Sequence, residues 1–137
     1  MSKANLFKEY LANNQIYMEE NVLEDGSIFF RTEQNMDNGG SVLLVVVFTP
    51  EDIVDFKVFN IAKLNNPLKK EAFHSLINDL NAEYRFTKFF EDQGSITASY
   101  SMPIDKDFDP QEIFDKLIML YRSSEDSFSK FMKLLWA

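Results

Sequence analysis

Residues 65–102, NNPLKKEAFHSLINDLNAEYRFTKFFEDQGSITASYSM, decide the fold because they combine a capped helix, a strand, a tight turn and a second strand. Asn66 can cap the first free amides of the helix, and Pro67 suits the first helical position, where no N–H is needed. Beyond them apolar residues recur every three or four positions, as on a helix with one buried face. These residues are Leu68, Ala72, Phe73, Leu76, Ile77, Leu80 and Tyr84.

The hydrophobic period changes from helical spacing to two after this helix. Residues 96, 98, 100 and 102 are apolar and alternate with Thr and Ser, which predicts a strand with one apolar and one hydroxylated face. Residues 92–95 (DQGS) supply the hairpin turn, since Gly94 can adopt positive φ. In the resulting arrangement we expect Phe73 and Ile77 to face the sheet.

The first 64 residues predict one helix and four strands. Ser2 can cap a short helix with an apolar stripe that ends at residues 13–14. Strands are expected over residues 16–23, 28–33, 42–48 and 53–64, with hairpin turns at 24–27 and 35–40. The third strand, VLLVVVF before Thr49, is apolar on both sides, which predicts an interior strand covered on both faces or on one face and an edge.

A last helix is predicted to begin at Pro110, with Asp109 as its cap, and to extend to Leu135. The complete order is therefore α-β-β-β-β-α-β-β-α. Runs of adjacent strands favour a mainly antiparallel sheet with helices on its face or ends, so the fold class is α+β. A chain of 137 residues suits one domain spanning residues 1–137.

Composition excludes several classes of function. The chain has no cysteine, so disulfides, thiol nucleophiles and cysteine-ligated metals are excluded. A net charge of −8 argues against nucleic acid as a partner, since binding to phosphates depends on lysine and arginine. The longest apolar run, residues 42–48, is too short for a membrane helix, and no signal peptide is recognised. We expect a soluble, cytoplasmic protein.

Three segments carry a family resemblance: LINDLNAEYRFTKFF, GSITASYSMPI and FDPQEIFDKLIMLY, within about residues 70–135. They resemble the second half of YbjN-like proteins, a bacterial family described as candidate sensory transduction regulators. The features that carry the likeness are the pair Asn78 and Asn81, the strand RFTKFF, and the hairpin ending in Met102 and Pro103. The resemblance implies a type III secretion chaperone-like fold and a binding or regulatory module with no established catalytic site.

Four groups of residues invite a chemical interpretation, and each has a stronger structural one. DKDFD (residues 105–109) suggests a calcium loop, but Pro110 stands where the glycine belongs, so we predict a solvated loop and a helix cap. His74, the only histidine, is expected at the surface or its boundary. Asn81 is expected to bond strand backbone or to end the helix. The cluster Phe86, Phe89 and Phe90 is expected in the core, not in a ligand platform.

We therefore expect a non-enzymatic module that binds another, unidentified protein, with no catalytic, cofactor or metal residues. The alternative is a small-ligand receptor or an enzyme with a carboxylate-based site, which would need a concave pocket and shifted pKa values. The residues that could act as acid or base in that alternative are Glu19, Glu20, Glu33, Asp55 and His74.

The length of the last helix suggests self-association. From residue 110 to 135 it would span about 39 Å, whereas strands of about eight residues span about 27 Å. Either the helix bends near residues 123–124 and folds its end onto the first helix, or a second subunit covers that end. We favour a homodimer, since a large exposed apolar patch is unusual in a monomer. The predicted interaction surface consists of Phe128, Phe131, Met132, Leu135 and Trp136.

Overall fold

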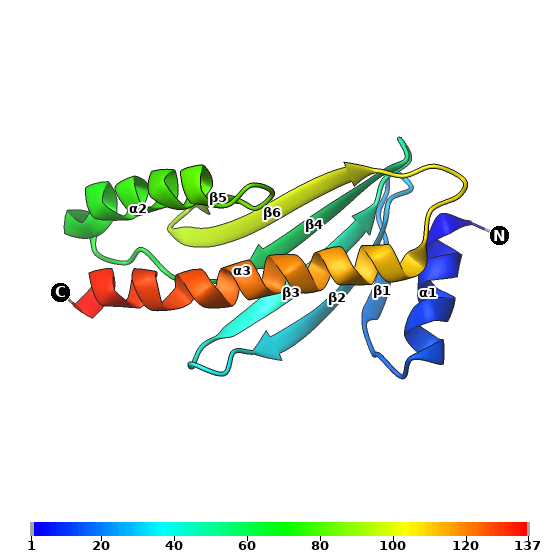
Figure 1. The fold of residues 1–137 in the computed structure, drawn as a ribbon, viewed down its shortest axis with the longest axis horizontal. Helices are drawn as coiled ribbons and strands as arrows, with labels where there is room; N and C mark the ends of the chain where they lie inside the picture. The colour runs from blue at the N-terminus through cyan, green and yellow to red at the C-terminus, as the bar shows by residue number, and fades with distance from the viewer. Residues whose placement is uncertain (1, 137) are drawn as a thin grey trace.

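A computed structural model describes residues 2–136 and shows one sheet covered on one face by helices (Figure 1). Its element order confirms the predicted α-β-β-β-β-α-β-β-α arrangement of an α+β protein. The elements are α1 (Lys3–Asn13), β1 (Glu19–Val22), β2 (Ile28–Asn35), β3 (Ser41–Phe48), β4 (Ile53–Phe59), the 3-10 turn η1 (Pro67–Lys69), α2 (Lys70–Glu83), β5 (Lys88–Asp92), β6 (Ser95–Pro103) and α3 (Pro110–Trp136).

The six strands form an antiparallel sheet in the order β1-β2-β3-β4-β6-β5. The first four strands make a meander. The chain then crosses over through α2, and β6 enters beside β4, with Phe56 opposite Tyr100, which leaves β5 at the edge. The two edges of the sheet are therefore the short strands β1 and β5.

The tight turn that closes the second hairpin is the one predicted at residues 92–95. Asp92 pairs with Ser95, and the two residues between them, Gln93 and Gly94, have φ of 50° and 84°. Two successive positive φ values match the right-handed twist of the strands. A Cβ at position 94 would come 3.0 Å from the Leu64 carbonyl oxygen, so the turn also needs glycine for space.

Strand β3 is interior, as predicted, but helices cover only one of its faces. Val46 on the helix side is fully buried, and its neighbours across the sheet are also buried. On the opposite face Val45 is nearly buried without a helix above it. It lies between Arg31 and Lys57 in the register, so the stems of these long side chains cover it. Coverage of both faces by other elements is therefore wrong for this strand.

Two predicted strands are shorter in the structure. The first begins at Glu19, not at residue 16, and the fourth ends at Phe59 because Asn60 adopts a φ of 68°. After this kink the chain still follows β6: the Ile61 amide donates to the Ile96 carbonyl and the Ile96 amide donates to the Ala62 carbonyl. Residues 61–62 thus extend the pairing without belonging to a regular strand.

Helix α3 lies across the middle of the sheet and approaches it closely. Ser124 and Ser127 are fully buried on its inner side, and their hydroxyls donate to the carbonyls of Leu120 and Ser124. Small side chains let the helix backbone approach the strands, and the hydroxyls are satisfied within the helix itself. The helix continues unbroken through residues 123–124, so it does not turn back onto α1.

The two shorter helices cover different halves of α3. Helix α1 sits beside its first half, where Tyr10 and Phe114 have ring centroids 6.0 Å apart. Helix α2 covers its second half, where Phe73 and Phe131 are both fully buried with centroids 5.4 Å apart. Phe73 is therefore buried, as expected, but it contacts the last helix as well as the core. Part of the overhang of α3 is thus covered within the same chain, by α2 and not by the predicted bend onto α1.

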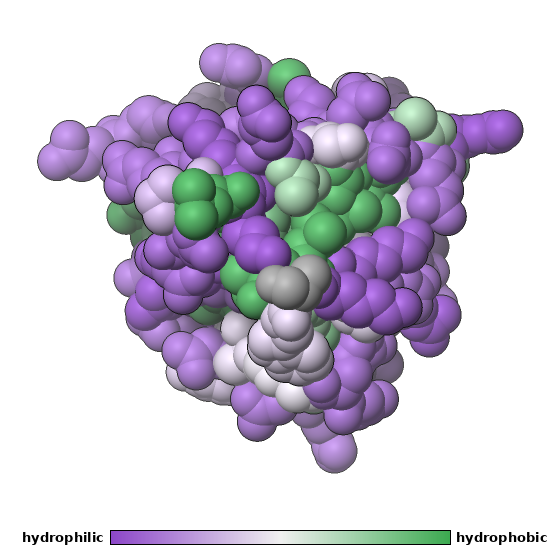
Figure 2. All heavy atoms as spheres, turned by 90° about the vertical axis from the view of Figure 1, so that its left-hand side faces the viewer, coloured by the Kyte–Doolittle hydropathy of each residue, from purple (hydrophilic) through white to green (hydrophobic). Residues whose placement is uncertain are grey.

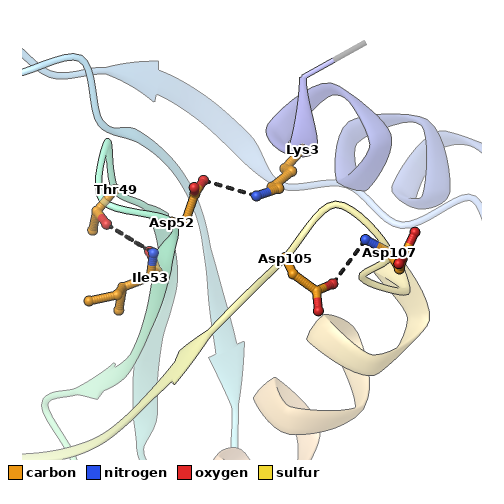
Figure 3. A network of polar contacts seen from close by, with 6 residues as sticks. All are labelled: Lys3, Thr49, Asp52, Ile53, Asp105 and Asp107. Carbon is orange, nitrogen blue, oxygen red and sulfur yellow. Dashed lines mark hydrogen bonds and ion pairs between the residues drawn. The ribbon is translucent and has the colours of Figure 1, made fainter.

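The turn after β3 joins three parts of the fold (Figure 3). The side chain of Asp52, a residue with a φ of 59°, forms an ion pair with Lys3 of α1 at 2.9 Å. The Asp52 carbonyl accepts a hydrogen bond from the Ile104 amide after β6. Within the turn, the Thr49 hydroxyl donates to the Ile53 carbonyl. The start of α1 is thus held against the end of the sheet from which α3 begins.

Although α3 has 27 residues, within residues 2–136 neither it nor another helix is apolar enough over its length to cross a membrane.

Replacing Phe73 by alanine should lower the free energy of unfolding by about 3–5 kcal/mol, because a fully buried aromatic ring is lost and a cavity remains beside Phe131. Urea denaturation measures this loss. The matched control is Leu68→Ala, on a side chain that is 91% exposed, which should change stability by less than about 0.5 kcal/mol. Similar losses in the two variants would mean that α2 is not packed as described.

Candidate functional site

The predicted interaction surface at the end of α3 is only partly exposed. Phe131 is fully buried against Phe73, so its place in an exposed surface was wrong, and a charge at this position would disrupt the core. Phe128 is half-buried over the β2–β3 hairpin, where a Cβ at Gly40 would come 3.0 Å from its ring. Met132 and Leu135 are half-buried as well, whereas Trp136 is 81% exposed.

The apolar side chains that do reach solvent here come from two segments. We use the name end surface for Leu64, Leu68, Met132, Leu135 and Trp136. Leu68 is 91% exposed, although the sequence placed it in the buried stripe of α2. The reason is local: residues 67–69 form a 3-10 turn, so this residue does not continue the face that Phe73 begins.

The last turn of α3 lies beside the first turn of α2, because the two helices run antiparallel. Contacts between them advance in opposite directions along the chain: Ser123 bonds Thr87 after the end of α2, Lys130 pairs with Glu83, and Phe131 contacts Phe73. Figure 1 shows the start of α2 and the end of α3 at the same end of the molecule. The end surface is therefore one region, not two.

The side chain of Asn81 hydrogen-bonds the backbone of β5 at the exposed edge of the sheet, which is one of the two roles predicted for it. Its side-chain oxygen accepts from the Phe89 amide at 2.7 Å, and its side-chain nitrogen donates to the Phe89 carbonyl at 3.0 Å. A single side chain thus supplies the pair of hydrogen bonds that a neighbouring strand would supply. Addition of a partner strand at this point of the edge is blocked.

The phenylalanine cluster after α2 divides between core and surface. Phe89 is buried on the helix side and contacts Tyr84 with ring centroids 5.6 Å apart. Phe90 is half-buried on the opposite face, and Phe86 is 57% exposed with its ring against Tyr100. The expectation of a common core position is therefore wrong for Phe86.

The candidate acid–base residues do not converge on one pocket. Glu20 is paired with Lys8 of α1, and Asp55 accepts from the Ser101 hydroxyl. Glu19 and Glu33 line a shallow hollow of about 300 Å³ on the face of the sheet without helices. A hydrogen bond from Asn21, followed by the charge of Arg31, lowers the pKa of Glu19, so this carboxyl stays ionised and is unsuited to proton donation at neutral pH.

His74 lies on the exposed side of α2, as expected, and joins that helix to β5. Its Nε2 is 2.9 Å from the Glu91 carboxylate, which also accepts from the Gly94 amide at 3.0 Å. The hydrogen bond from His74 is the main cause that lowers the pKa of Glu91, and the amide of Gly94 is the second. The ion pair between His74 and Glu91 holds α2 against the hairpin. The two side chains contact each other directly, so no nucleophilic side chain lies between them.

Two of the three carboxylates of DKDFD accept bonds from backbone amides, and the segment is a loop that ends in the predicted helix cap. The Asp105 side chain accepts from the Asp107 amide at 2.9 Å (Figure 3), and Asp109 accepts from the Gln111 amide at 2.9 Å at the start of α3. Across residues 2–136 no cluster of three or more histidine, aspartate and glutamate side chains could hold a metal ion.

Comparison with known proteins supports the fold. The class defined above is an α+β protein whose six-stranded antiparallel sheet carries three helices on one face. A solved structure of this class, the crystal structure of YbjN from E. coli, described as a candidate transcription regulator, is similar with a TM-score of 0.64 and 11% sequence identity, over 93% of this chain and 89% of that one. The chain has a YbjN-like fold. Neither a family model nor a curated protein matches it.

Removing the Asn81 amide should destabilise the protein by about 1–3 kcal/mol, since two hydrogen bonds to Phe89 are lost. Asn81→Ala and Asn81→Asp both test this, and the aspartate places a carboxylate against the Phe89 carbonyl. Asn78→Ala, exposed on the same helix, is the control and should cost less than about 0.5 kcal/mol. If the Asn81 and Asn78 variants unfold at the same denaturant concentration, the edge-closing role is refuted.

Acid should weaken the link between α2 and β5. Because the pKa of Glu91 is lowered in the folded state, its contribution to stability is present above the ordinary pKa of about 4.5 and is lost as the pH falls through the folded value. Between about pH 6 and pH 3.5, the free energy of unfolding measured with urea should therefore fall more for the wild type than for Glu91→Gln. An equal fall in the free energy of unfolding of the two proteins would show that the pair of His74 and Glu91 contributes nothing to folding.

Proposed function

We propose that this protein is a non-enzymatic interaction module, a small regulator or chaperone-like binder that acts by holding another protein. The observation that carries the proposal is the end surface, where Leu68 and Trp136 are 91% and 81% exposed. Large apolar side chains that gather in one exposed region are typical of protein-binding sites. The similar fold of YbjN, described as a candidate regulator, supports the same class of function.

The arrangement of the polar side chains supports binding over catalysis. The carboxylates considered above do not all meet in one pocket, and the ones with resolved partners bond lysine, serine, arginine or asparagine side chains. General acid–base chemistry needs a group with a pKa near neutrality within reach of a bound substrate. The lowered pKa of Glu19 is the opposite of what such a general acid requires.

Capture of a partner from the native host tests the proposal. The full chain, immobilised through its N-terminus, should retain one protein reproducibly, and Leu68→Asp and Trp136→Asp should lose it. Tyr17→Asp is the matched control, because Tyr17 is 80% exposed but lies in the connection between α1 and β1, and Figure 1 shows α1 at the opposite end of the molecule from the end of α3. If no protein is retained, or if the Tyr17 variant loses it equally, the end surface is not the binding site.

A further inference from the structure

The end surface is apolar at its centre and charged at its margin. Figure 2 looks onto the end of the molecule where α2 starts and α3 ends, and it shows hydrophobic side chains in the middle of this face within a ring of hydrophilic ones. Three segments build this end: residues 60–72, residues 129–136 and the hairpin at residues 91–94, whose Glu91 and Gly94 line a hollow together with Leu64 and Lys70. Their charges decide what kind of partner fits.

The charge of this end is opposite to that of the rest of the chain. Residues 60–72, 91–94 and 129–136 contain five lysines and three acidic residues, Glu71, Glu91 and Asp92, which gives +2. The remaining residues contain nine basic and 19 acidic side chains, which gives −10. The overall charge of −8 therefore hides a basic end on an acidic protein. The five lysines are Lys63, Lys69, Lys70, Lys130 and Lys133.

Helix stability does not explain the lysines at the start of α2. Lys69 and Lys70 lie where the helix dipole is positive, a position that favours aspartate or glutamate and disfavours cations. Lys133, in the last turn of α3, is favourably placed with respect to its own helix. Lys130 pairs with Glu83. The cations at the α2 start thus oppose the local helix, and although Lys70 lies near Glu91 and helps to lower its pKa, the margin of the end surface keeps an excess of lysines.

A second copy of this chain is a poor occupant of the end surface. A two-fold dimer brings the same patch of both subunits together, so the lysines at the margin of one subunit would lie close to those of the other beside a desolvated apolar centre. Like charges in such an interface are costly. A flat anionic membrane would satisfy the lysines of this end, but it would repel the acidic remainder of the chain more than a short acidic segment would.

We propose that the end surface binds an acidic, amphipathic segment of another protein, with its apolar side chains against Leu68 and Trp136 and its carboxylates beside Lys70 and Lys133. This inference rests on the proposed binding function and names the chemistry of the partner. Complementary charge would also speed association and make it sensitive to salt.

Binding at the end surface can be followed by the fluorescence of Trp136, since it is the only tryptophan in the chain. Two tryptophan-free helical peptides serve as probes: both carry the same leucine face, and the other face carries either glutamate or lysine. Titration of the full chain with the glutamate peptide should shift the Trp136 emission to shorter wavelength, and the lysine peptide should not. Raising the salt concentration should weaken the response.

A matched pair of charge-reversal variants locates the site. Lys70→Glu/Lys133→Glu should weaken binding of the glutamate peptide at least tenfold. Lys106→Glu/Lys116→Glu changes the charge equally but lies on the loop before α3 and on its first half, so it should bind as the wild type does. Thermal unfolding of both variants establishes that they are folded.

Three results would overturn the inference. Equal binding of the two peptides would show that charge does not select the partner. Equal weakening by both double variants would place the site elsewhere. A Trp136 shift with phosphatidylglycerol vesicles but with neither peptide would assign the surface to membranes. A failure with the peptides leaves the capture experiment decisive for the proposed function, because that experiment does not assume an acidic partner.

Discussion

The contact between Phe73 and Phe131 is the constraint on which the second half of the molecule depends. Helix α3 is longer than the strands that it crosses, and without this contact the apolar face of its end, beyond Phe128, would extend into water. The two rings are fully buried, with centroids 5.4 Å apart, and they attach α2 to α3 where the sheet offers least support. Burial of two phenylalanine side chains is worth several kcal/mol, a large part of the stability of a domain.

The same contact explains where the exposed apolar surface lies. With Phe131 covered by α2, Trp136 in the last turn of α3 and Leu68 in the turn before α2 remain exposed at the same end of the molecule. The edge of β5 cannot take over the role of binding site at Phe89, because Asn81 already occupies its hydrogen bonds. In the proposed function, the partner is therefore expected at the end of the helix pair.

Local patterns predicted what depends on local geometry. The turn at Gly94, the bond from Asn81 to strand backbone and the buried faces of β4 and β6 follow from spacing and from the preferences of single residues. The placement of α2 over α3 does not, because it joins residues 73 and 131, which no periodicity connects. Leu68 was misplaced for a related reason: one 3-10 turn rotates it off the buried face, and the sequence carries no signal for that change.

The central claim is that the end surface is free to receive another protein, and the mass of the isolated chain in solution tests it directly. Size-exclusion chromatography with light scattering should give a single species of 16 kDa across the micromolar range, the mass of one chain. A species of twice that mass, converted to a folded monomer by Trp136→Asp, would contradict the account. It would show that a second subunit covers the end surface, as the length of α3 first suggested.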